Sequence, residues 1–252
     1  MNIQAEIQQV FSIHSGIPLF YIESGSRLWG FESPDSDFDV RGFHLQTKNT
    51  YFDYRRPLDV IEQNDGLFDF VSFDLDKMFN LLAGSNPNCL EWLRGHLQYL
   101  DNLPELERLR ESVFSFYESK ALYHHYLSLA RNNIQRMEQD TKFTYKTVLY
   151  CLRGILSSEV SARGELPPLL ITDLIECSHL GEDIIVLIQD CVEKKKNLLE
   201  KTEIPNKTQV LQSIHNVFES VNSLPIAQKG QPEKLRAELS AIAIKIKENH
   251  YG

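Results

Sequence analysis

The chain has 252 residues, of which 42% are hydrophobic and 10% aromatic, enough to fill the core of one large or two small domains. Its formal net charge of -9 argues against a protein that coats nucleic acid non-specifically, because such binding rests on lysine and arginine meeting phosphates. No signal peptide or membrane-spanning apolar run is evident, so we expect a cytoplasmic protein. The four cysteines form no C-x-x-C pair and are expected to be buried, reduced thiols: Cys89, Cys151, Cys177 and Cys191.

Hydrophobic periodicity divides the chain into a mixed first part and a helical second part. In the first part we expect helices at residues 2–13, 75–82 and 90–93, strands at 18–22, 37–45, 58–61 and 67–73, and a loop from Thr47 to Arg56. Strand signals vanish from about residue 103, and we expect helices at 104–117, 120–137, 145–160, 183–199, 208–221 and 232–249. The sequence therefore predicts an α+β fold with a mixed domain over residues 1–110 and an all-helical domain over residues 111–252.

A glycine turn follows the first predicted strand. The strand ends at Gly25 and Ser26, where glycine allows a sharp bend, and Trp29 and Gly30 then suggest one short helical turn. A Gly-Ser pair at a helix N-terminus presents unpaired backbone N–H groups, a hydroxyl and the positive end of the helix dipole, a combination that suits a phosphate. The same pair is also common as a plain turn between two apolar runs.

Two aspartates open the next predicted strand. Asp37 and Asp39 alternate with Phe38 and Val40, so both carboxylates point to one face while the apolar side chains enter the core. Two carboxylates on one face repel each other unless a cation lies between them, and Mg²⁺ is commonly held by one or two carboxylates together with substrate phosphates. Asp35, in the preceding turn, is expected to be solvated. The phosphate cradle and the carboxylate pair together outline a phosphoryl-transfer site.

The order of these features resembles a known superfamily. A Gly-Ser pair, a short helical turn and an Asp-x-Asp strand are the signature of DNA polymerase beta-like nucleotidyltransferases. Residues 25–42, 69–79 and 86–91 more closely resemble the predicted nucleotidyltransferases of an RNA repair pathway, the RlaP-like or YcgL-type family. The resemblance covers roughly residues 20–95. It implies that residues 1–110 form a polymerase beta-like nucleotidyltransferase domain, a small mixed sheet with flanking helices, whose nucleotide pocket the helical domain completes.

The resemblance implies transfer of a nucleoside monophosphate from an NTP, such as ATP, to an acceptor hydroxyl with release of pyrophosphate, in the presence of Mg²⁺ or Mn²⁺. Such sites use a third carboxylate on a neighbouring strand to help activate the acceptor. We expect Asp69 in this role because it begins a run of strand character, which makes the catalytic and metal-binding set Asp37, Asp39 and Asp69. Asp74 is the alternative, although it is well placed to cap the following helix.

A polar stripe in the helical half is a candidate nucleotide contact. Lys146, Tyr150 and Arg153 recur at helical spacing beside an apolar stripe, and such side chains hold phosphates or contact a base or sugar. The alternative is a solvated polar face, which is also the expectation for the run Lys194 to Lys196. The predicted nucleotide-binding residues are Gly25, Ser26, Arg27, Ser36, Lys146, Tyr150 and Arg153.

Two alternative functions, from other classes of protein, stay open. A catalytically silent, antitoxin-like regulatory module would bind a nucleotide or a partner on the same fold, and a structural interaction protein would carry these residues by coincidence. All three candidate aspartates are present, which favours the enzyme. The partners are then an NTP donor and an acceptor that the sequence leaves open between an RNA end, a small molecule and a protein hydroxyl, and no membrane is expected.

Overall fold

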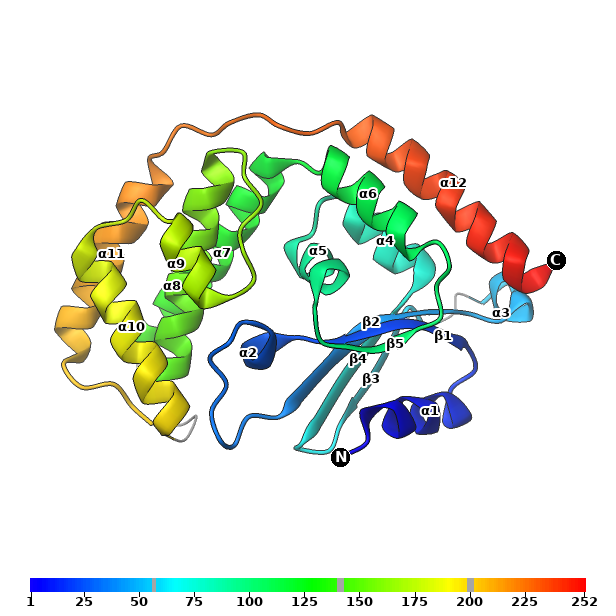
Figure 1. Cartoon of the computed structure of the whole chain (residues 1–252), viewed down its shortest axis with the longest axis horizontal. Helices are drawn as coiled ribbons and strands as arrows, with labels where there is room; N and C mark the ends of the chain where they lie inside the picture. The colour runs from blue at the N-terminus through cyan, green and yellow to red at the C-terminus, as the bar shows by residue number, and fades with distance from the viewer. Residues whose placement is uncertain (56–57, 140–142, 199–201) are drawn as a thin grey trace. The chain divides into compact units, whose positions relative to one another are not determined.

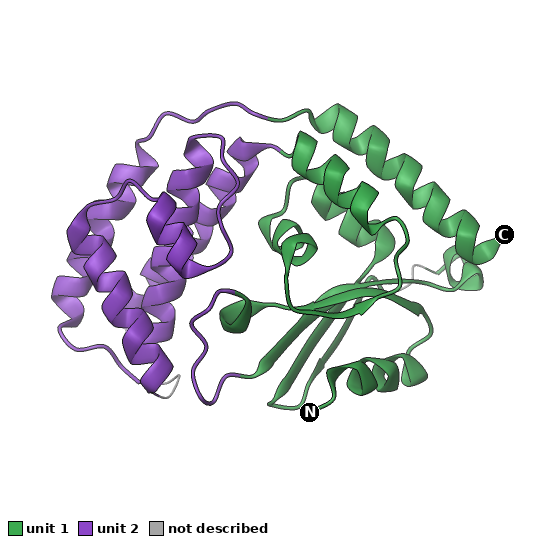
Figure 2. Cartoon of the chain, viewed as in Figure 1, with its two compact units in different colours: residues 1–28, 37–117, 230–252 green, residues 29–36, 118–229 purple. Residues whose placement is uncertain are grey.

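The computed structural model describes residues 1–55, 58–139, 143–198 and 202–252. Two compact units divide the chain (Figure 2): unit 1 contains residues 1–28, 37–117 and 230–252, and unit 2 contains residues 29–36 and 118–229. The units therefore interleave along the sequence, whereas a single division after residue 110 was expected. The loop expected from Thr47 to Arg56 and the helix expected at 183–199 each end at a residue outside the described ranges.

Unit 1 is built on a mixed five-stranded sheet, which confirms the α+β prediction (Figure 1). The strands lie in the order β3-β4-β2-β1-β5, and β2 and β4 are parallel while the other neighbours are antiparallel. Their bounds are β1 Ile17–Glu23, β2 Phe38–Leu45, β3 Val60–Asn64, β4 Phe68–Asp74 and β5 Gln98–Asp101. The sequence did not predict β5, because its four residues form a short edge strand with exposed ends and no apolar alternation.

Helices cover both faces of this sheet (Figure 1). Helix α1 (Ile3–Ile13) packs Ile7 and Val10 against one face, in a cluster with Tyr21 and Phe70. The other face is covered by α4 (Leu75–Ala83) and α5 (Pro87–Arg94), followed by α6 (Leu106–Phe116), and α12 (Pro232–Tyr251) packs on α4 and α6. The short helices are α2 (Gly25–Leu28) and α3 (Lys48–Phe52), the latter where a loop was expected; it forms because Thr47 caps its first turn.

A buried polar network crosses the centre of the sheet. The Gln46 amide nitrogen lies 3.2 Å from His44 Nε2, so His44 Nδ1–H donates to Ser72 Oγ at 2.7 Å, and Ser72 Oγ also bonds the Tyr21 hydroxyl at 2.6 Å. His44 is fully buried, and burial lowers the pKa of its imidazole from 6.5 to about 4. Protonation would place a hydrogen on Nε2, where the amide of Gln46 already donates.

The contribution of His44 to stability depends on pH. Between pH 6.5 and about 4 the unfolded chain binds a proton on His44 that the folded protein does not, so the free energy of unfolding falls as the pH falls through that window. The contribution of this group amounts to about 3 kcal/mol. His44→Gln is expected to remove it, which denaturant titrations of both proteins at pH 7 and pH 4.5 will measure. An unchanged pH dependence in the variant would contradict the assignment.

Unit 2 is helical, with α7 and α8 packed against each other over most of their length. Its helices are α7 (Ser119–Glu138), α8 (Tyr145–Ala162), α9 (Ile171–Cys177), α10 (Glu182–Asn197) and α11 (Lys207–Asn222). Gly154 on α8 permits the close approach, because a Cβ there would lie 3.1 Å from the backbone oxygen of Tyr126. The sequence did not predict α9, whose two turns are too short for a clear periodicity. Within the described part of the chain, no helix is both long and apolar enough to cross a membrane.

Two expectations about burial are wrong in unit 2. Lys195 is not on a solvated face: it is 1% exposed, its Nζ donates to Ser33 Oγ at 3.4 Å, and it lies 5.8 Å from the centre of the Phe31 ring. The prediction failed because charge assigned all three lysines to the outside, whereas helical spacing places Lys195 on the buried side of α10, in line with Ile184 and Ile188. Cys177 is exposed, while Cys89, Cys151 and Cys191 are buried as expected.

Candidate active site

The three predicted aspartates lie together in unit 1. Asp37 immediately precedes β2, and Asp39 on β2 is the register partner of Asp69 on the parallel strand β4. One carboxylate oxygen from each of the three lies within 4.8 Å of the other two, and all three residues are half-buried. Parallel pairing of β2 with β4 creates this cluster, because it places the beginnings of the two strands side by side (Figure 1).

The structure separates the two candidates for the third carboxylate. Asp74 pairs with His44 at the other end of the β2–β4 ladder, five residues beyond Asp69. Its carboxylate caps α4 by accepting from the Asp76 backbone N–H at 3.0 Å and accepts from the Tyr51 hydroxyl at 2.6 Å. Burial raises the pKa of Asp74 from its ordinary value. Asp69 therefore joins the acidic cluster, and Asp74 has the capping position that the sequence allowed for it.

Arg41 pairs with two of the three aspartates. Its Nη2 donates to Asp39 Oδ1 at 2.8 Å and to Asp69 Oδ2 at 2.9 Å, while its Nη1 donates to the backbone oxygens of Asp69 and Val40. The sequence analysis missed this residue. Side-chain alternation was the available signal, because Arg41 follows Asp39 by two positions on the same strand and therefore shares its face.

The backbone around Asp39 is held from β1. The Asp39 N–H donates to Glu23 Oε1 at 3.0 Å, the Ser24 N–H donates to the Asp39 carbonyl at 2.8 Å, and the Tyr99 hydroxyl donates to Glu23 Oε2 at 2.5 Å. Glu23 is fully buried, and burial raises the pKa of its carboxyl group. No sequence signal identified Glu23, because its neighbourhood depends on how β1 pairs with β2 and with β5.

Gly25 directly contacts the acidic cluster. Its φ is +61°, in the left-handed region, and a Cβ at this position would lie 2.0 Å from Asp39 Oδ2. Ser26 is buried. Arg27 Nε donates to the Asp37 carbonyl at 3.0 Å, and its guanidinium lies 4.3 Å from the centre of the Phe38 ring. The predicted residues of α2 therefore lie against the beginning of β2, next to the aspartates.

The remaining predicted nucleotide contacts belong to unit 2. Ser36 Oγ accepts from the Ser33 N–H at 2.9 Å within a turn. The stripe on α8 contacts Trp29: the Arg153 guanidinium lies 4.0 Å from the Trp29 ring centre and the Tyr150 ring centre lies 5.2 Å from it. Lys146 Nζ lies 5.7 Å from the Tyr150 ring. Arg153 is buried, so the stripe is not a solvated face; its nucleotide-binding role stays a prediction.

The acidic cluster fits a divalent cation. Three carboxylates supply hard oxygen ligands, the kind that Mg²⁺ and Mn²⁺ prefer, and their spacing lets one ion reach an oxygen of each. In the structure the Arg41 guanidinium supplies the positive charge between Asp39 and Asp69.

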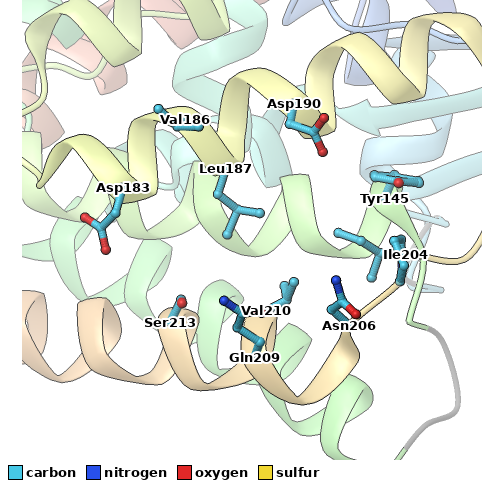
Figure 3. A pocket seen from close by; sticks show the side chains of 11 residues that line it. Tyr145, Asp183, Val186, Leu187, Asp190, Ile204, Asn206, Gln209, Val210 and Ser213 are labelled. Carbon is cyan, nitrogen blue, oxygen red and sulfur yellow. The ribbon is translucent and has the colours of Figure 1, made fainter.

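A separate cavity of about 400 Å³ lies in unit 2 between α10 and α11 (Figure 3). Leu187 and Val210 form apolar walls, and Asp190 and Gln209 add polar groups. None of the predicted site residues is among the described residues that line it. No local sequence pattern predicts this cavity, because its lining comes from helices whose pairing is a matter of tertiary structure.

The mixed sheet, the helical second half and the three clustered aspartates agree with the α+β fold and the acidic set that the motif resemblance implied. Comparison with protein families makes this specific: the chain belongs to the RlaP family, described as the RNA repair pathway DNA polymerase beta family, whose model matches residues 2–243. The resemblance inferred from the motifs is therefore confirmed.

The relatives have no described activity. The uncharacterized protein YcgL of Bacillus subtilis (strain 168) is 29% identical over 233 residues, covering 91% of this chain and 89% of YcgL. The uncharacterized protein MJ0002 of Methanocaldococcus jannaschii is 29% identical over 192 residues, covering 71% and 74%. A crystal structure of a nucleotidyltransferase-like protein from Exiguobacterium sibiricum matches with a TM-score of 0.34 and 12% identity, covering 98% and 80%.

Proposed function

We propose that this protein is a metal-dependent nucleotidyltransferase that moves a nucleoside monophosphate from an NTP to an acceptor hydroxyl. Two facts support the proposal: membership of a polymerase beta family and the cluster of Asp37, Asp39 and Asp69. The cluster carries the argument, because three carboxylates this close together repel one another and gain from a cation and from the phosphates that accompany it.

In this mechanism the chain supplies position and charge. Asp37 and Asp39 would hold Mg²⁺ or Mn²⁺, and Asp69 would complete the set on the acceptor side. An ion held there would supply positive charge to stabilise the attacking and leaving oxygens. The acceptor oxygen bonds to the α-phosphorus as the bond from that phosphorus to the pyrophosphate oxygen breaks, and the proton of the acceptor hydroxyl passes to the Asp69 carboxylate. Gly25 and Ser26, in α2 beside Asp39, are the residues we propose to contact the departing phosphates.

The family description leads us to propose the hydroxyl of an RNA end as the acceptor. The overall charge of -9 provides no general attraction for nucleic acid, so recognition of the RNA has to be local to its end. Incubation of the protein and Mg²⁺ with labelled ATP and a short RNA should extend the RNA when its 3′ end carries a hydroxyl and not when that end is phosphorylated. Labelling of the protein itself, without RNA, would contradict this acceptor.

The donor site is tested by thermal unfolding with each of the four NTPs, with and without Mg²⁺. A nucleotide present at about one hundred times its dissociation constant stabilises the folded state by about 2.7 kcal/mol, which raises the melting temperature by several degrees. We expect this rise with at least one NTP and only when Mg²⁺ is present. EDTA in place of the metal is the control, and the absence of any shift would contradict the proposed donor site.

A second candidate function is favoured by the pairing of Arg41 with Asp39 and Asp69. Because this pairing neutralises two of the carboxylates without a metal, it also suits a catalytically silent module that binds a nucleotide or a partner. The two candidates separate in the thermal experiment followed by an assay of pyrophosphate release. Nucleotide binding without any pyrophosphate release, over all the acceptors tested, would favour the silent module.

A further inference from the structure

The guanidinium of Arg41 makes four hydrogen bonds beside the acidic cluster. Four acceptors surround it: Asp39 Oδ1, Asp69 Oδ2 and the backbone oxygens of Asp69 and Val40. Its side chain is 16% exposed, and those of Asp39 and Asp69 are 19% and 28% exposed. One nitrogen, Nη2, bridges the two carboxylates, so it lies between the oxygens that face each other across the β2–β4 ladder.

A divalent cation would compete for this position. Metal ligation by Asp39 Oδ1 and Asp69 Oδ2 requires Nη2 to leave those oxygens. Ligation by the other oxygens of the same carboxylates would leave the metal and the guanidinium a few ångströms apart, where two positive charges repel each other strongly in a half-buried site. In either geometry the contact with Arg41 and the binding of metal oppose each other.

We propose that Arg41 is a resident counter-cation of the site, which a divalent metal displaces from Asp39 and Asp69 when it binds. This inference rests on the proposed metal-dependent function. It explains how two neighbouring carboxylates remain together in the metal-free protein, and it predicts that Arg41 lowers the affinity for free metal. Arg41 is a positioning residue in this scheme, because it acts on the metal site through the two carboxylates.

The first test is a titration with Mn²⁺ alone, in which the free ion is measured by its electron paramagnetic resonance signal. Arg41→Met keeps the length and the apolar stem but removes the charge, and we expect it to bind Mn²⁺ about tenfold or more tightly than the wild type. Arg41→Lys keeps a positive charge and is the matched control, with an affinity close to that of the wild type. Equal or weaker binding by Arg41→Met would overturn the proposal.

A second measurement uses the unaltered protein, in case Arg41→Met fails to fold. In nitrogen-15 NMR spectra the side-chain signals of Arg41, assigned by their loss in Arg41→Lys, should show the slow rotation of a guanidinium held by carboxylates. Saturation with diamagnetic Mg²⁺ should shift these signals towards those of a free arginine. Signals that stay unchanged while Mg²⁺ displaces Mn²⁺ from the protein would show that metal and Arg41 bind together, and the proposal would be wrong.

These outcomes distinguish the inference from the function on which it rests. If the wild type and Arg41→Met both fail to bind Mn²⁺, the metal site itself is absent and both proposals are overturned. If both proteins bind Mn²⁺ with the same affinity, the metal site stands and only the role of Arg41 is overturned.

Discussion

Asp39→Asn is expected to lower nucleotidyl transfer by more than about a hundredfold, because loss of a residue that merely supports a metal ligand already costs 10- to 100-fold. Asp39 is the central member of the cluster. Its Oδ1 pairs with Arg41 on the same strand, and its Oδ2 lies against Gly25. An amide in its place keeps the shape and an oxygen that accepts from Arg41, but it removes the negative charge that a divalent cation needs.

The fold should survive this substitution. The amide oxygen of asparagine can still accept from Arg41 Nη2, and the bonds of Arg41 to Asp69 and to the backbone oxygens of Asp69 and Val40 are unaffected, so no buried donor loses its partner. Asp35→Asn, in the exposed turn just before β2, is the matched control and should keep full activity. Pyrophosphate release and the melting temperature of the three proteins provide the measurement. Full activity in Asp39→Asn would remove the acidic cluster from the mechanism.

Local sequence patterns were sufficient to predict the parts of the site that lie within one element. Alternation along β2 indicated that Asp37 and Asp39 share a face, and the strand character after residue 69 indicated that Asp69 begins a strand. The structure then adds what no local pattern contains, the parallel register in which Asp39 faces Asp69. The motif resemblance anticipated this proximity only because the family carries three such carboxylates.

Residues that depend on tertiary pairing were missed for the same reason. Glu23 supports Asp39 only because β1 and β2 are antiparallel at that point, and Lys195 is buried only because Phe31 and Ser33 pack against α10. Both are charged, and charge in a sequence is usually a sign of exposure, so their burial contradicts the local expectation. Arg41 is different, because alternation along β2 is sufficient to place it on the same face as Asp39.

Gly25→Ala is expected to abolish most activity by a different route from Asp39→Asn. The new methyl group would lie 2.0 Å from Asp39 Oδ2, so the carboxylate has to move, and a displacement of about 1 Å in such a site can cost about 100-fold in rate. The backbone contributes a separate penalty, because the φ of +61° costs a residue other than glycine about 1–2 kcal/mol. Affinity for Mn²⁺ and pyrophosphate release should therefore fall together with stability.

Gly66→Ala separates these two effects. Gly66 also has a positive φ, +94°, but a Cβ there would have no neighbour within 4 Å, so the substitution carries backbone strain without a collision. We expect it to lose stability on the same scale as Gly25→Ala while keeping its affinity for Mn²⁺ and its activity. If the two variants lost activity equally, general destabilisation would account for both results. A loss of activity confined to Gly25→Ala would show that glycine is required at this position because only a residue without a side chain leaves space for the Asp39 carboxylate.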